Sequence, residues 1–122
     1  MAENKQYVTQ TRENGTVMIS EDVIATIIEH AIKEVEGVAG LNIKAGADII
    51  EMLGKKIAGK GVKIEIGEQD ELYIDCNINI IFGQSIVTVA QAVQEVIVNA
   101  LQSTANLTVA SVNVNVCGIV RQ

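Results

Sequence analysis

The first clear pattern along the chain is a change from alternating to helical spacing of the hydrophobic residues. Residues 15–19 alternate between apolar and polar side chains, which predicts a short strand. Ser20 follows and is a favourable helix N-cap residue. After it, hydrophobic residues recur at the spacing of one helix face: Val23, Ile24, Ile27, Ile28, Ala31, Ile32 and Val35. This stripe predicts an amphipathic helix that packs on a core and ends before Gly37, a typical residue beyond a helix C-terminus.

The middle of the chain predicts a β-hairpin. Residues 61–67 alternate, a polar turn follows at 68–71, and residues 72–82 alternate again. The second arm should point one set of side chains inward: Leu72, Ile74, Cys76, Ile78, Ile80 and Phe82. Tyr73 and the polar residues between them should face outward.

The last third of the chain predicts a second helix and a closing strand. Ser85 can cap a helix that runs to about Ser103, because hydrophobic residues again recur at helical spacing after it. Residues 108–119 then alternate. Their inward side chains should be Ala110, Val112, Val114 and Val116.

These elements predict the fold class α+β, in the order βαββαβ. One mostly antiparallel sheet covered by the two amphipathic helices satisfies the pattern, since each helix must bury its single apolar stripe. A ferredoxin-like arrangement is the candidate for that order. We expect residues 1–14, which are polar and lack periodicity, to form a flexible arm before one domain over 15–122. The glycine-rich segment before the hairpin disfavours a long helix, and we expect a short extra helix near 47–58.

Length and hydrophobicity indicate a single soluble domain. The chain has 122 residues, of which 48% are hydrophobic, and its apolar runs are far shorter than the roughly 20 residues that span a bilayer. The polar N-terminus has no apolar stretch of the secretory type, so we expect a cytosolic protein with no span of its own. Cys76 and Cys117 lie within apolar runs, and we expect both to be buried, reduced thiols.

The charge distribution gives the first candidate for a partner surface. The net charge is −6, which disfavours nucleic-acid binding by bulk attraction, but five of the nine basic residues fall within 44–63. Such a window is found in partner surfaces and, more often, in solvated loops. The candidate partner surface combines these lysines with the outward asparagines of the predicted sheet: Lys55, Lys56, Lys60, Lys63, Asn77, Asn79, Asn113 and Asn115.

The chain offers little for catalysis, metal or cofactor binding. His30 is the single histidine, and we expect it at the edge of the core beside the helix stripe. One histidine and two distant cysteines are too few for a structural zinc site. Residues 54–61 resemble a phosphate loop superficially, but Gly61 stands where the magnesium-binding hydroxyl belongs. Tyr73 alone cannot form a base-stacking platform on the open sheet face. We therefore expect no catalytic, cofactor or metal site.

Five segments together resemble a known family. They are residues 16–25, 35–40, 60–66, 80–86 and 109–116. In order and spacing they are similar to the alkaline shock protein family of Gram-positive bacteria, also called the Gls or general stress family, over roughly Gly15 to Val120. The chain departs from the family pattern at Glu36, where proline is frequent, at Phe82, where tyrosine is frequent, and at Asn106, where glycine is frequent.

The resemblance implies a cytoplasmic, non-enzymatic protein linked to envelope stress and held near the membrane by a small membrane-anchored partner. It carries over no site residues. The leading hypothesis is therefore an interaction or scaffold protein in cell-envelope stress homeostasis, which self-associates or binds such a partner. Two alternatives stay open: a nucleic-acid-binding module that uses the lysine-rich segment 44–63, and a regulatory accessory protein of fatty-acid metabolism.

Overall fold

A computed structural model describes residues 6–41 and 61–121 of the chain. This part of the chain contains two helices and six strands, and the predicted α+β class is confirmed. In chain order they are β1 (Tyr7–Arg12), β2 (Gly15–Ser20), α1 (Glu21–Lys33), β3 (Val38–Leu41), β4 (Val62–Ile66), β5 (Leu72–Ile81), α3 (Ile86–Ala105) and β6 (Val109–Val120). The predicted order is contained in this series, which adds β1 and β3. The short helix expected near 47–58 lies outside the described residues.

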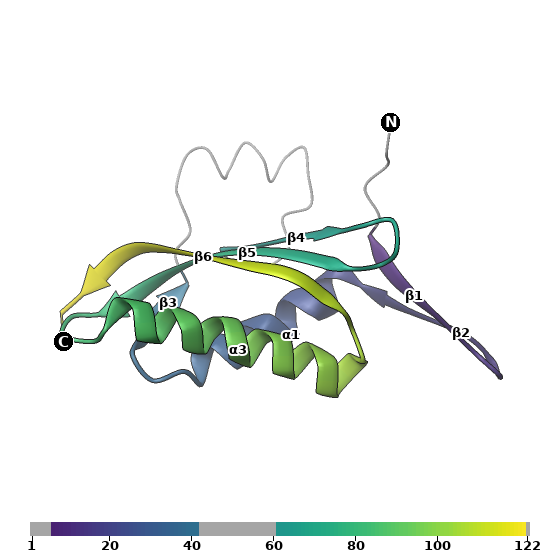
Figure 1. Cartoon of the computed structure of the whole chain (residues 1–122), viewed down its shortest axis with the longest axis horizontal. Helices are drawn as coiled ribbons and strands as arrows, with labels where there is room; N and C mark the ends of the chain where they lie inside the picture. The colour runs from purple at the N-terminus through teal and green to yellow at the C-terminus, as the bar shows by residue number, and fades with distance from the viewer. Residues whose placement is uncertain (1–5, 42–60, 122) are drawn as a thin grey trace.

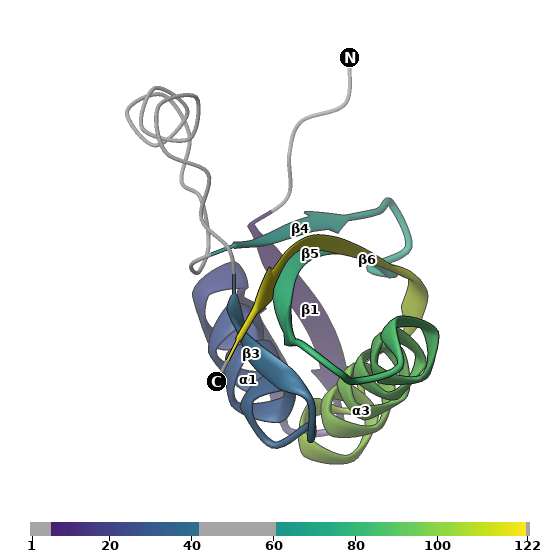
Figure 2. The same ribbon diagram turned by 90° about the vertical axis from the view of Figure 1, so that its left-hand side faces the viewer.

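Strand β5 is the centre of the main sheet. It pairs antiparallel with β4 over residues 72–76 and with the short β3 over residues 78–80, so these two strands follow each other along one edge. Strand β6 pairs parallel with β5 along its whole length, on the other edge. The sheet curves over α1 and α3, which lie side by side beneath one of its faces (Figures 1 and 2). The opposite face is not covered by either helix.

The first two strands form a separate two-stranded sheet. Residues 7–12, predicted as part of a flexible arm, pair in register with 15–20 as an antiparallel hairpin, so the flexible-arm prediction is wrong for this segment. Val8 is buried in the common core, and Gln10 Nε2 donates to the Ala105 carbonyl at 2.9 Å. These contacts fix the hairpin to the end of α3. The strand predicted at 15–19 therefore pairs with β1 and is not part of the main sheet. The predicted ferredoxin-like arrangement in one sheet is wrong, because the described strands form two sheets.

The alternation of hydrophobic residues correctly predicts the core between sheet and helices. The inward residues of β5 are all fully buried, as are the central positions of both helix stripes. In order along the chain, the buried side chains of largest volume are Ile24, Ile28, Ile32, Val62, Leu72, Ile74, Cys76, Ile78, Ile80, Val93, Ile97 and Leu101. Both predicted caps are confirmed, since Ser20 accepts from the Val23 amide and Ser85 from the Thr88 amide.

Several predicted inward positions are exposed instead. Val23 is 50% exposed, because the buried face of α1 runs through Ile24 and Ile28 and does not extend to Val23. Phe82 is 62% exposed, because it follows the last residue of β5. Ala110 is exposed because the pairing of β5 with β6 shifts by one residue between Val109 and Ser111. Cys117 is exposed as well, so only Cys76 is the buried thiol that was predicted.

Candidate interaction surfaces

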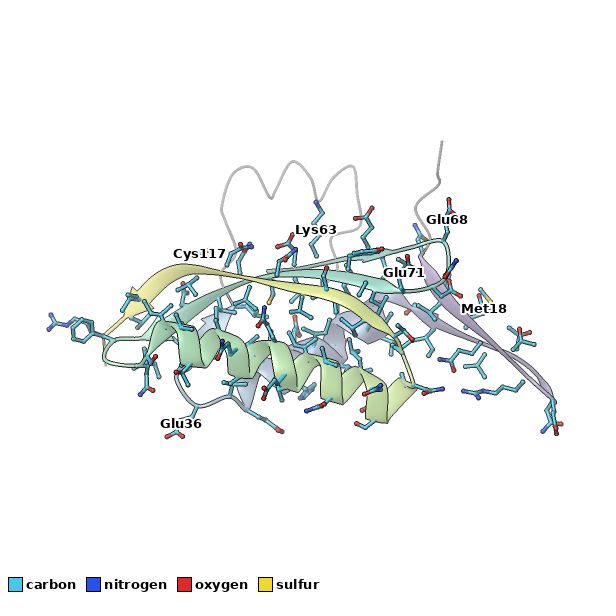
Figure 3. The ribbon with its side chains drawn as sticks, viewed as in Figure 1. Met18, Glu36, Lys63, Glu68, Glu71 and Cys117 are labelled. Carbon is cyan, nitrogen blue, oxygen red and sulfur yellow. The ribbon has the colours of Figure 1, made fainter. Side chains whose placement is uncertain are left out.

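The predicted partner surface falls on the uncovered face of the main sheet. Lys63 on β4 is exposed there, and it points away from the helices, as Cys117 on β6 does (Figure 3). Asn77, Asn79 and Asn113 lie on the same face by the alternation of their strands. The remaining lysines of the predicted surface, Lys55, Lys56 and Lys60, lie outside the described residues.

The parallel register of β5 and β6 joins some of these asparagines into one network. Asn77 lies opposite Asn115, and Asn115 Nδ2 is 2.9 Å from Asn77 Oδ1 and 3.0 Å from Asp75 Oδ1. The Asn115 amide therefore bridges two residues of the neighbouring strand. Asn113 lies opposite Asp75 and outside this network, while Asn79 lies opposite Gly118. Part of the asparagine surface thus holds the sheet together.

The described charges on this face are mixed in sign. Lys63 lies opposite Asp75 in the hairpin register, and the exposed Glu65 follows two residues later on β4. The Tyr73 hydroxyl donates to Glu71 at 3.0 Å, and this bond and the negative charge of Glu71 raise the pKa of Tyr73. A nucleic-acid surface needs clustered positive charge, and the described part of the face does not supply it.

A second candidate surface lies at the end of the molecule where β5 and β6 finish and α3 begins. There the Phe82 amide donates to the Val120 carbonyl at 2.7 Å, which brings the two strand ends together. Half of the large hydrophobic side chains that are exposed among the described residues lie at this place. We call this group of side chains the apolar end, and its members are Phe82, Ile86, Val87, Ile119 and Val120. The Arg121 guanidinium lies over the Phe82 ring, 5.3 Å from its centroid.

Sequence reasoning missed the apolar end because it gave nearly every hydrophobic residue a role in the core. Part of the information needed to predict this exposed cluster was present in the sequence. Phe82 stands directly before Gly83, where a strand ends and helix coverage has not yet begun, and Val87 lies off the helix stripe. The contribution of Ile119 and Val120 depends on which strand β6 pairs with, so it required the tertiary structure.

The remaining chemistry-bearing residues are scattered. His30 is exposed in the last turn of α1, not at the edge of the core as predicted. Within residues 6–41 and 61–121, no three residues of the types that ligate metals come together. In the same part of the chain, neither helix combines the length and the apolar character needed to cross a membrane.

Comparison with known proteins gives one family. The model of the alkaline shock protein 23 family, described as having a cell envelope-related function, matches residues 9–121. The chain is 36% identical to the uncharacterized protein YqhY of Bacillus subtilis over 86% of this chain and 77% of that protein. It is 32% identical to the uncharacterized protein YloU of the same organism, over 86% and 88%. It is 31% identical to the uncharacterized protein Spy1535 of Streptococcus pyogenes, over 88% and 81%.

Proposed function

The chain belongs to the alkaline shock protein 23 family, whose function is related to the cell envelope, and from this premise we propose that it works by binding another protein. It is a non-enzymatic interaction protein in cell-envelope stress homeostasis. Its partner is a second copy of the chain or a small membrane-anchored protein, so that it is cytoplasmic and reaches the membrane only through that partner.

The observation that carries this proposal is the apolar end. Monomeric proteins expose few clustered hydrophobic side chains, and clusters bordered by polar residues mark interaction sites. Here five large apolar side chains are each at least 40% exposed at one end of the fold, one directly after β5 and two each from α3 and β6. Phe82 is the natural anchor, since an aromatic side chain buries much surface at low entropic cost.

Substitution of Phe82 tests the proposal in cells. Tagged full-length protein is cross-linked and purified from its own cells, and the recovered partner is quantified for wild type, Phe82→Ser and Phe82→Tyr. We expect Phe82→Ser to lose the partner by about tenfold or more, since buried aromatic anchors contribute 2 kcal/mol or more, and Phe82→Tyr to retain it.

Met18→Ser is the matched control. Met18 is 58% exposed, close to the exposure of Phe82, but lies on the β1–β2 hairpin at the opposite end of the molecule (Figures 1 and 3). Met18→Ser should recover as much partner as wild type does.

Sedimentation of the purified proteins then separates the two kinds of partner, since only self-association changes the mass of the pure protein. Equal recovery with Phe82→Ser and wild type would refute the proposal.

A further inference from the structure

A groove runs along one side of α3, and it begins beside the apolar end at Gln84 and Ser85 but does not include Ile86 and Val87. It has a volume of about 520 Å³. Its lining comes from the loop after α1 and from α3 with the two residues before it: Val35, Glu36, Gln84, Ser85, Thr88, Val89, Ala92, Glu95, Val96 and Asn99. All of these belong to the described residues. The groove therefore lies on the helix side of the molecule, opposite the asparagine face.

The floor of the groove is apolar and follows one stripe of α3. Val89 is buried, and Ala92, Val96 and Val35 are partly exposed to the groove. Between Ser85 and Asn99 the lining residues recur every three or four positions, so they form one face of the helix over about 21 Å at 1.5 Å per residue. This face of α3 is as long as a bound helix of about four turns.

The charged groups of the groove have one sign. Glu36 and Glu95 are both exposed on its walls, and among residues 6–41 and 61–121 no lysine, arginine or histidine lines it. Glu36 projects on the helix side of the fold, opposite to Lys63 (Figure 3). Acidic groups on the wall and an apolar floor are complementary to a helix that has a hydrophobic stripe bordered by lysine or arginine.

We propose that this groove binds a basic amphipathic helix of a partner protein. The hydrophobic stripe of that helix packs on Val89, Ala92 and Val96, and its flanking basic side chains pair with Glu36 and Glu95. The inference rests on the proposed protein-binding function, but it assigns a second surface, on a different side of α3 from the apolar end.

A synthetic peptide measures the binding directly. The probe is a fluorescein-labelled helix of about 14 residues with leucine at helical spacing and lysine elsewhere, and its affinity for the full-length protein is read by fluorescence anisotropy at about 0.15 M salt. The double variant Glu36→Lys, Glu95→Lys should weaken binding about tenfold or more. The same peptide with glutamate in place of lysine should not bind wild type.

The double variant Glu13→Lys, Glu65→Lys is the matched control. It changes the net charge by the same amount, but both residues are exposed outside the groove, on the β1–β2 turn and on the sheet face. It should bind the peptide within about twofold of wild type, because screening limits distant charges. Equal weakening in the two double variants would show attraction by net charge alone and overturn the proposal. So would failure of the wild type to bind the lysine peptide.

Two further outcomes separate this proposal from the function proposed above. If Glu36→Lys, Glu95→Lys sediments with a different mass from wild type and Phe82→Ser does not, a second copy fills the groove and the proposal is wrong. If Phe82→Ser abolishes peptide binding, the groove is not a separate site, and the proposal fails while the proposed function stands. Peptide binding that survives Phe82→Ser but not the groove substitutions supports the groove, whatever the apolar end does in cells.

Discussion

At the scale of the residue, Gly37 lies in the loop after α1 and packs closely against the start of α3. Its φ is +100°, and a Cβ atom there would lie 2.8 Å from Val89 Cγ2. Gly83 has nearly the same φ, +99°, but a Cβ atom would meet nothing within 4 Å. The two glycines therefore separate the cost of the backbone conformation from the cost of a steric clash.

Alanine substitutions at the two glycines should differ in effect. We expect Gly83→Ala to lower the free energy of unfolding by about 1 kcal/mol through the backbone alone. Gly37→Ala should lower it by about 2 to 4 kcal/mol, since Val89 must also move in a packed core. Urea denaturation of both variants measures the difference, and equal losses would show that Val89 yields without cost.

Cys76 is the second residue whose environment changes its chemistry. Burial, with a smaller effect from the negative charge of Asp75, raises the pKa of the Cys76 thiol from 9.0 to about 12. The folded state therefore favours the neutral thiol. Its contribution to stability is complete below about pH 9 and is lost as the pH rises towards 12, because the unfolded chain releases the proton first.

Cys76→Ala tests this pH dependence. Wild type should lose about 1 kcal/mol more than the variant between pH 8 and pH 10, since one unit of pKa difference corresponds to about 1.4 kcal/mol. Denaturation at both pH values gives the two slopes, and the constant cost of the smaller alanine side chain cancels between them. Parallel slopes would mean that the thiol ionises equally easily in the folded state.

At the scale of the element, the pairing of β5 with β6 is reinforced by side chains on its open face. Asn115→Ala removes two hydrogen bonds, to Asp75 and Asn77, and should cost about 1 kcal/mol, because the bonds are exposed and water replaces them in part. Asn113→Ala, on the same strand and face but outside the network, should cost less than about 0.5 kcal/mol. Thermal unfolding compares the two variants. A loss as large for Asn113 would indicate strand propensity as the cause.

The edge of β6 that does not face β5 is protected against pairing with a further strand. No described strand pairs with this edge, and Gln94 of α3 donates from its Nε2 atom to the Val112 carbonyl at 3.0 Å. The register of the β5–β6 pair also shifts between Val116 and Gly118. Side-chain cover and bulges both protect an edge strand from adding further strands. The apolar end and the groove are therefore better candidates for partner binding than this edge.

At the scale of the whole molecule, the N-terminal hairpin is part of the domain core. Val8 is only 3% exposed, whereas Val17, on the second strand of the same hairpin, is 48% exposed. Val8→Ala should destabilise the whole domain by about 1 to 2.5 kcal/mol, through one cooperative transition, and Val17→Ala by less than about 0.5 kcal/mol. Chemical denaturation followed by circular dichroism measures both. A wild-type midpoint for Val8→Ala would show that the hairpin unfolds separately.

The candidate surfaces divide according to how much of them the sequence can specify. Alternation alone places Asn77 and Asn115 on the outer sheet face, but only the parallel register puts them 2.9 Å apart. The apolar end was only partly predictable, because the positions of Phe82 and Val87 indicate exposure, whereas that of Ile119 and Val120 depends on which strand β6 pairs with. The groove was not predictable, since Glu36 and Glu95 are 59 positions apart and meet only when α1 packs against α3.

The sequence by itself determined the α+β class, both helix caps, the β4–β5 hairpin and the buried faces of β5 and the two helices. These features follow from local periodicity and capping, in which each residue interacts with near neighbours. Only the tertiary structure decided that residues 7–12 pair as a strand, that β2 leaves the main sheet, and that β6 runs parallel to β5. Strand pairing joins backbone groups of distant segments, so the local pattern shows that a strand forms but not which strand it pairs with.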